Sequence, residues 1–440
     1  MTVTTGSFAS GFLEQEARAL LTRLDRVRPF VLNETMVPAA ALFPTAQSAI
    51  DGFLIAGRRA LRQQVQAYLA WLRGPGRDAT PAEQQRRFTL IRMRFNDVLS
   101  QFDLFTEVVT QRSEHSTGVW LSGLDSLAAD ALGVPGPGIS PPPVVCYLAR
   151  GPGAAIRRAR TRLPGNAANP VAIVRVPRER MIGHGIASSL VHEVGHQAAA
   201  LLDLVPGLRQ ELRRAQATRP PTSRAAWACF ERWISEIVAD MWSVARLGIS
   251  STLGLMGVVS LPRWFVFRDG GEDPHPTPYV RVLISCAMGN ELYPHPQWAR
   301  TCRTWRELYP LVDVSAAQRQ AISEVVEQVP LFTRLLLDHR PASLRGRTLR
   351  EHLYLADRRA EPLAEQFEVW RRRPATAYRV PPTLAFAVVG QARASGRLAP
   401  EPESRLLGDL LTHWAVRSSL DVSALCASAA QGRAQQLYAA

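Results

Sequence analysis

The sequence contains no lysine, so arginine alone supplies its basic side chains and a formal net charge of +14. Exclusive use of arginine, together with many alanines and prolines, is typical of a GC-rich genome. The arginines also lack the interleaved aromatic residues of a base-stacking surface. The charge is therefore weak evidence for nucleic-acid binding, and we expect no nucleic-acid partner, although a weak preference for acidic surfaces stays open.

Cysteine is scarce as well, with five residues in 440. The number is odd, the spacings are wide and no C-x-x-C pair occurs, which excludes a disulfide framework and a structural cysteine–zinc site. We interpret these residues as buried free thiols in a reducing compartment. They are Cys146, Cys229, Cys286, Cys302 and Cys426.

Long hydrophobic runs are missing too. The nearest to one is the uncharged stretch 247–261, which is short and interrupted by glycine and serine, so a buried helical hairpin is a better interpretation than a transmembrane helix. The first residues have neither a basic region nor a long apolar core, and we expect no signal peptide. These features predict a cytoplasmic protein without an integral membrane span.

Hydrophobic residues make up 46% of the chain and charged residues 20%, as in a globular protein. Apolar residues recur at helical spacing through most of residues 13–130, where an aromatic stripe is interpreted as core. A segment dense in proline and glycine, 133–143, then separates this region from two short β-like runs, 144–149 and 171–176. The fold class predicted is mainly α with a small β-sheet (α+β). The domains predicted are a helical region 1–133, a central domain 134–310 and a helical region 311–440.

The chemistry centres on the segment 186–201, which reads IASSLVHEVGHQAAAL. His192 and His196 are four residues apart and share one face of a helix, so both imidazoles can reach one ion. Glu193 can stand beside a water on that ion. Apolar residues on all sides predict a buried helix, in which unpartnered polar groups would be unfavourable. The segment therefore predicts a Zn²⁺ site, with an unmetallated polar core as the alternative.

A catalytic zinc needs a third protein ligand. The metzincin pattern requires a histidine ten residues after His192, where Leu202 stands, so it is excluded. A later predicted helix, 223–247, carries Glu236 and Asp240 on one face. Glu236 is the preferred third ligand, and Asp240 is expected to accept a hydrogen bond from a ligand histidine. Glu231 and Asp240 are alternative third ligands on the same helix.

The segment 273–281, DPHPTPYVR, offers groups that could stabilise an oxyanion. Its prolines are expected to hold His275 in a fixed position. Arg281 qualifies by type, and Tyr279 is a weaker candidate. The alternative is a rigid turn in which Arg281 pairs with Asp240 or with another acid.

Three pieces now stand in order, LVHEVGH, EIVAD and HPTPYVR, and together they resemble the HtpX-type and prenyl-protein (CAAX) zinc peptidases. The resemblance covers about residues 185–285, less than half of the chain. It implies a gluzincin-type site: zinc ligands His192, His196 and Glu236, Glu193 as the base, and Asp240 behind a ligand. It also implies that His275 and Arg281 face the oxyanion or order the site. Many members of that family are membrane-embedded, which departs from this chain.

The sequence thus predicts a zincin-like catalytic domain flanked by helical regions. Its predicted activity is that of a zinc metalloendopeptidase, a hydrolase acting on a protein or peptide substrate. In zincin-type peptidases the strand before the motif helix presents its edge to the substrate, and 171–176 is either such a strand or a plain sheet strand. The alternative function is a helical interaction or scaffold protein with an inactive or structural zinc site.

Overall fold

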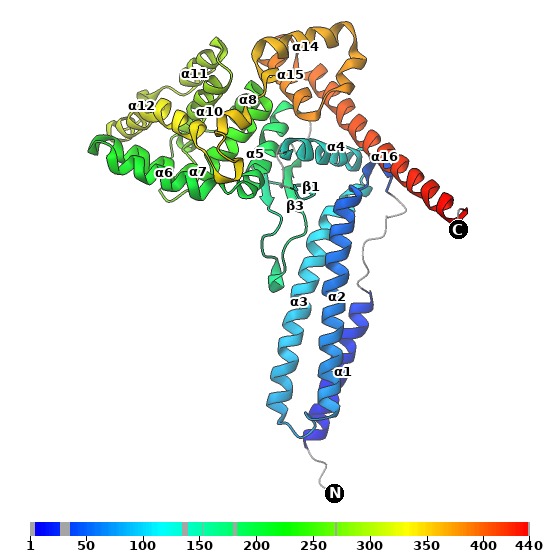
Figure 1. The fold of residues 1–440 in the computed structure, drawn as a ribbon. Coiled ribbons are helices and arrows are strands. Elements are labelled where there is room, and N and C mark those ends of the chain that lie inside the picture. Colours follow the sequence, from blue (N-terminus) through cyan, green and yellow to red (C-terminus); the bar gives the residue numbers. More distant parts are fainter. Residues whose placement is uncertain are drawn as a thin grey trace.

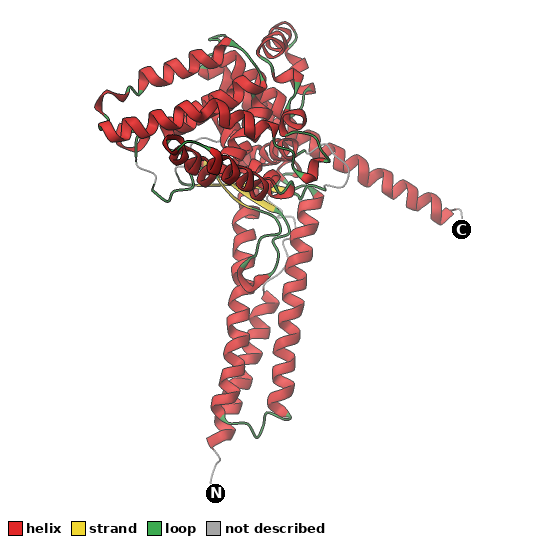
Figure 2. Ribbon diagram, turned by 60° about the vertical axis from the view of Figure 1, so that its left-hand side comes forward, coloured by secondary structure: helices red, strands yellow, loops and turns green. Residues whose placement is uncertain are grey.

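The computed structural model describes residues 5–26, 36–133, 140–151, 153–178, 183–268 and 271–438. Helices dominate the described residues, and a small sheet lies where a long helical arm joins a larger helical body (Figures 1 and 2). The predicted class, mainly α with a small β-sheet, is confirmed. Most of the predicted linker 133–143 lies outside the described residues.

The arm consists of three helices that lie side by side, with the N-terminus at its far end (Figure 1). Thr80 caps the third helix by accepting a hydrogen bond from the amide of Glu83, and Pro81 is its first residue. The apolar stripes of the second and third helices are buried between them, which explains why these segments are stable as helices. The three are α1 (Thr5–Arg26), α2 (Pro44–Arg73) and α3 (Pro81–Thr110).

The sheet has the strand order β1-β3-β2. β1 (Val144–Ala149) pairs in parallel with β3 (Ala172–Pro177), and β2 (Ala155–Arg157) pairs antiparallel with the other edge of β3. The two predicted β runs are confirmed, whereas β2 was missed because it has only three residues. The suggestion that the run 171–176 presents a free edge to a substrate is wrong, since neighbouring strands pair with both edges of β3.

The sheet separates two hydrophobic cores. Side chains alternate between the faces of a strand, so Val174 of β3 packs into the body while its neighbour Ile173 packs into the arm. The core of the body extends from α4 (His115–Leu132) to Trp414 near the end of the chain. The proposed division at 133/134 and 310/311 stays a prediction.

A buried ion pair fastens the sheet to the helices at this junction. Arg112 and Asp125 have almost no exposed side-chain area, and Nη1 of Arg112 lies 2.8 Å from Oδ2 of Asp125. Both residues also bind the backbone of Cys146 in β1: Arg112 donates to its carbonyl, and its amide donates to Asp125. This network holds the base of the arm in a fixed position on the body. The sequence analysis did not find it.

The body is built around α5 (His184–Leu201) and α7 (Pro221–Leu247), which pack against each other. The segment predicted as a helical hairpin forms one helix, α8, which follows a turn at Gly248. Among the described residues, none of the helices combines the length and the apolar character that a membrane crossing needs. The other helices are α6 (Leu204–Thr218), α8 (Ile249–Val259), α9 (Arg263–Val266), α10 (Pro278–Leu292), α11 (Pro296–Leu308), α12 (Ala316–Asp338), α13 (Leu349–Leu353), α14 (Ala360–Arg372), α15 (Pro382–Ala394) and α16 (Pro400–Tyr438).

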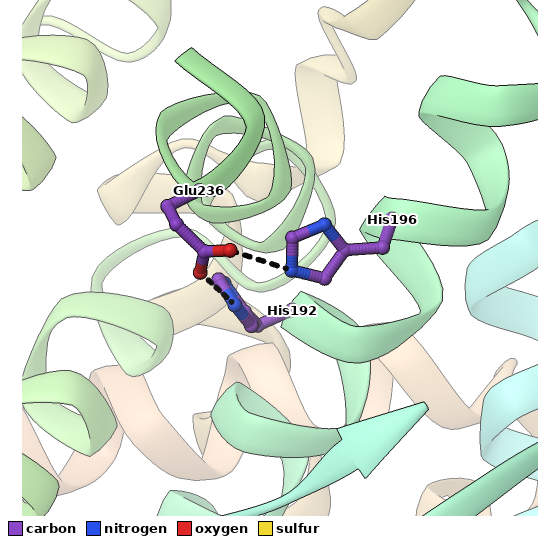
Figure 3. Close-up of side chains that lie close together, drawn as sticks. All are labelled: His192, His196 and Glu236. Atoms are coloured by element: carbon purple, nitrogen blue, oxygen red, sulfur yellow. Dashed lines mark ion pairs between the residues drawn. The ribbon is translucent and has the colours of Figure 1, made fainter. Parts of the chain in front are cut away.

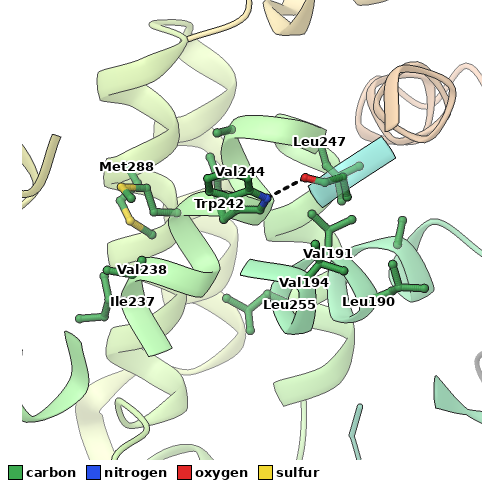
Figure 4. Close-up of a cluster of buried hydrophobic side chains, with 14 of the residues drawn as sticks. Leu190, Val191, Val194, Ile237, Val238, Trp242, Val244, Leu247, Leu255 and Met288 are labelled. Carbon is green, nitrogen blue, oxygen red and sulfur yellow. Dashed lines mark hydrogen bonds between the residues drawn. The ribbon is translucent and has the colours of Figure 1, made fainter. Parts of the chain in front are cut away.

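Close contact between α5 and α7 depends on Gly195. A Cβ atom at this position would lie 2.9 Å from the Cα and from the carbonyl oxygen of Ala239 in α7. Apolar side chains of both helices fill the surrounding interface (Figure 4). Trp242 fixes α7 to α4 because its indole Nε1 donates to the carbonyl of Ala131 at 2.9 Å. The two helices that carry the candidate ligands are therefore held at backbone contact.

Candidate metal centre

The site begins on α5, where His192 and His196 lie one turn apart with ring centroids separated by 4.9 Å. Glu193 is the only carboxylate in α5, and the residues around the motif are otherwise apolar. Leu190, Val191 and similar residues are buried, as the sequence predicted, so they anchor the helix in the core. The imidazoles face a partly open region, with 13% and 16% of their side-chain areas exposed.

α7 brings Glu236 to these imidazoles (Figure 3). Its Oε2 lies 3.2 Å from Nε2 of His192, and its Oε1 lies 3.4 Å from Nε2 of His196. One ligand atom from each of the three residues lies within 4.8 Å of the others. The alternative ligand Glu231 is not part of this group and pairs with Arg213 at 3.0 Å. The sequence therefore identified the right residue of α7 for this group.

The three residues fit a metal ion. Ligand atoms about 2.0–2.1 Å from a tetrahedral zinc ion are about 3.3 Å apart. The observed separations of 3.2 and 3.4 Å are close to this value but involve different oxygens of Glu236, so small side-chain adjustments would complete the site. Oε2 of Glu236 is buried and makes no well-directed hydrogen bond to a described residue, although Nε2 of His192 and Nε2 of His275 lie 3.2 and 3.3 Å from it. A metal ion between these groups would compensate the burial of this oxygen more fully than such contacts do. The group can hold a metal ion.

Asp240 lies behind the first ligand, where the sequence analysis expected it. Its Oδ1 lies 2.8 Å from Nδ1 of His192, which leaves Nε2 of that ring directed at Glu236. This arrangement fixes the orientation of the imidazole and its tautomer. Arg281 makes a two-pronged contact with Asp240, with Nε at 2.7 Å from Oδ2 and Nη2 at 2.9 Å from Oδ1. The pairing of Arg281 with Asp240, one of the two sequence-based possibilities, is confirmed.

Charges in this cluster shift several pKa values. Burial lowers the pKa of His192, but Asp240 and then Glu236 outweigh it and raise the pKa to about 9. Burial raises the pKa of Glu236, yet the two imidazoles lower it further, so it stays well below its usual value. Burial likewise raises the pKa of Asp240, and the charges of Arg281 and His192 bring it down to about 2. Both carboxylates are therefore ionised, and the metal-free site holds a proton on His192 at neutral pH.

His275 approaches the cluster from the loop before α10. Its Nε2 lies 3.3 Å from Oε2 of Glu236, and 45% of its side chain is exposed. Asp273 holds the other nitrogen, since Oδ1 lies 2.7 Å from Nδ1 and also accepts the amide of His275 at 2.9 Å. Arg268 in turn pairs with Asp273 at 2.9 Å. The prediction that His275 is held in a fixed position beside the site agrees with these contacts.

Glu193 and Tyr279 lie in different surroundings. Glu193 follows the first ligand on α5 and forms no hydrogen bond or ion pair with a described residue, so its carboxylate is available as a base. Tyr279 is buried, with its ring 5.1 Å from that of Phe267. Tyr279 thus belongs to the core rather than to the candidate oxyanion group.

Asp273 is the residue that the sequence analysis missed. It was quoted as part of the segment DPHPTPYVR but was given no role. An aspartate commonly accepts the backbone amide two residues later, and that contact is present here. The Asp-x-His pattern in the sequence could have indicated the contact between Asp273 and the amide of His275.

Comparison of the chain with family models, with curated proteins and with solved structures gives no match.

Proposed function

We propose that this protein is a zinc-dependent metalloendopeptidase of the gluzincin type. The observation that carries the proposal is that His192, His196 and Glu236 each bring a ligand atom within 4.8 Å of the others, on a helix where Glu193 directly follows the first of them. Two imidazole nitrogens and a carboxylate oxygen form the donor set of a catalytic zinc with one open position. A purely structural site needs no base beside it, which favours the enzyme over a scaffold. The resemblance to the HtpX-type and CAAX peptidases supports the same activity.

His192, His196 and Glu236 would hold the Zn²⁺ ion, which would lower the pKa of a bound water and polarise the carbonyl of the substrate. Glu193 would be the general base: its carboxylate would take a proton from the attacking water and pass it to the nitrogen of the leaving amine. Asp240 and Arg281 keep the ring of His192 oriented throughout, because their three contacts lie within 2.9 Å.

His275 is the better placed of the two candidate oxyanion groups. Its Nε2 faces the cluster and its ring is half exposed, so it can donate a hydrogen bond to a substrate carbonyl as negative charge develops there. Asp273 favours this role because it binds the other nitrogen and so holds the ring in place. The guanidinium of Arg281 already forms an ion pair with Asp240, and its proposed role is to order the site.

The test compares the purified protein with Glu193→Gln. We expect both proteins to bind one zinc ion, since Glu193 is not a ligand, and both to unfold at similar temperatures. Cleavage of a broad peptide library by Glu193→Gln should fall at least about 100-fold, because general base catalysis contributes that much or more. Metal content by mass spectrometry and fragment yield by chromatography are the two measurements.

Glu231→Gln is the matched control, since it neutralises a carboxylate of α7 that pairs with Arg213 outside the cluster. It should retain both zinc and activity. If the zinc-loaded protein and Glu193→Gln cleave equally, or neither cleaves any peptide, the site is structural and the scaffold function replaces the enzyme.

A further inference from the structure

The described residues line a cavity of about 480 Å³ between α7, α12 and the segment on both sides of His275. None of the three candidate ligands lines it, so it is separate from the metal centre. Trp233 does line it and stands three residues before Glu236 on α7, about 4.5 Å along the helix axis. Thr277, two residues after His275, lines the same cavity. Its volume is that of a small-ligand pocket.

Three side chains of this cavity can only donate hydrogen bonds, namely those of Arg232, Trp233 and Arg268. Trp233 is only 5% exposed, and its Nε1, which can only donate, has no acceptor among the described residues. The hydroxyl of Thr277 is buried without a partner as well. The side-chain amide of Gln318 is already bound to the carbonyl of Phe267. A buried donor without an acceptor is unfavourable, so these groups call for a ligand that accepts hydrogen bonds.

The cavity also favours negative charge. Arg232 and Arg268 line it, and no aspartate or glutamate is among the described lining residues. Asp269, next to Arg268 in the chain, lies outside the described residues. Arg232 is held in place because it donates to the carbonyl of Gly271. Arg232 and Arg268 thus bring positive charge to the lining, although Arg268 also pairs with Asp273, which is not among the lining residues.

The amino end of α12 adds to the positive electrostatic potential of the cavity. Ser315 caps α12 by accepting the amide of Gln318 at 3.2 Å, and both residues line the cavity with Ala317 between them. α12 has 23 residues, and its amino end carries the partial positive charge of the helix dipole. The remaining walls are apolar and suit the carbon skeleton of a bound side chain. They include Phe267, Val280, Ile322 and Val325.

We propose that this cavity binds a carboxylate of the substrate and thereby selects which peptides reach the metal centre. The carboxylate is that of an acidic side chain or that of a free C-terminus, and both would meet the same donors. The cavity and the site are joined through Arg268, which lines the cavity and binds Asp273, the residue that holds His275. The peptide nature of the ligand rests on the proposed function, whereas binding of a carboxylate does not.

The experiment measures binding without catalysis, using calorimetry on zinc-loaded Glu193→Gln. The probes are three acetylated tetrapeptides. The first contains glutamate and has an amidated C-terminus, and the second contains glutamine and has an amidated C-terminus. The third contains glutamine and has a free C-terminal carboxylate. We expect at least one carboxylate-bearing form to bind about tenfold more tightly than the neutral one, as for a charge-assisted hydrogen bond. The form that binds identifies the source, since only the last probe tests a free C-terminus.

Variants then locate the binding. Arg232→Gln should abolish the preference, and Trp233→Phe, which keeps the ring but removes the N–H donor, should reduce it several-fold. Arg224→Gln is the control, because this arginine lies two turns earlier on α7, is exposed, and within the described part of the chain its side chain donates to the backbone of Arg219 alone. Equal binding of acidic and neutral probes overturns the proposal, and so does a preference that survives Arg232→Gln. Cleavage without acidic preference refutes only the cavity proposal, whereas acidic preference without cleavage refutes only the peptidase.

Discussion

At the scale of single residues, Asp240 controls the protonation of His192. It lies between His192 and Arg281, with contacts of 2.8 Å to the first and 2.7 Å to the second. The arginine keeps Asp240 ionised, and the ionised carboxylate raises the pKa of the histidine to about 9. His192 is therefore protonated at neutral pH, and a metal ion that binds this group would have to displace that proton.

This gives a prediction for the pH dependence of metal binding. A pKa of about 9 lies above neutral pH, so zinc should release close to one proton from His192 at pH 7.5, and its affinity should rise with pH until about 9. Asp240→Asn removes the charge that raises this pKa and should release fewer protons. Calorimetric titration in two buffers of different ionisation enthalpy measures the number released. Equal release by both proteins would contradict the assigned role of Asp240.

Residue types and spacing already identified much of this site. His192, Glu193 and His196 are fixed relative to one another by a single helix, so their sequence pattern suffices to place them together. From the sequence, Glu236 was only the preferred third ligand over Glu231. Which of the two faces the histidines depends on how α7 is rotated against α5. The ion pair of Arg112 and Asp125 was not predicted, since its partners belong to different elements and have no pattern that links them.

At the scale of elements, the distance between α5 and α7 sets the geometry of the metal centre. Two of the ligands lie on one helix and the third lies on the other. Gly195 stands directly before His196 at the point of closest approach, where a side chain would meet the backbone of Ala239. The glycine of the motif therefore has a packing role here in addition to its place beside a ligand.

We predict that Gly195→Ala weakens the fold and the metal site together. The added methyl group would lie 2.9 Å from backbone atoms of Ala239, so the helices must separate, at a cost of about 1–3 kcal/mol in the free energy of unfolding. Zinc affinity should fall at least tenfold, because His196 moves away from Glu236. Denaturant titration and chelator competition measure the two effects.

Gly52→Ala is the control for the intrinsic effect of this exchange in a helix. Gly52 is exposed on α2, and a Cβ atom there meets nothing within 4 Å. Its replacement should stabilise the protein by up to about 1 kcal/mol and leave zinc affinity unchanged. A Gly195→Ala protein that behaves like Gly52→Ala would show that α5 and α7 are not in close contact.

At the scale of the whole molecule, two hydrophobic cores meet at one small sheet. The arm formed by α1, α2 and α3 extends from the body and buries its own apolar stripes (Figure 1). The three residues that could hold a metal ion all lie in the body, on α5 and α7. A ligand stabilises only the units whose folding creates its site, so zinc should act on one core more than on the other.

Hydrogen exchange measured by mass spectrometry tests this expectation. Saturating zinc should slow exchange in α5 and α7 and leave α2 and α3 unchanged. Leu54→Ala, at a fully buried position of α2, should cost about 2–5 kcal/mol and speed exchange in the arm alone. Equal protection of both regions by zinc would mean that the cores unfold as one cooperative unit.

The sequence by itself determined the helical character of the chain, the two longer strands and the metal-binding pattern on α5. These are local properties, because hydrophobic periodicity, capping residues and four-residue spacing all act within one element. The tertiary structure decided which carboxylate of α7 joins His192 and His196, that Arg281 binds Asp240, and that β3 has no free edge. Those outcomes depend on the distance and rotation between elements, which packing at positions such as Gly195 sets and which no short sequence pattern encodes.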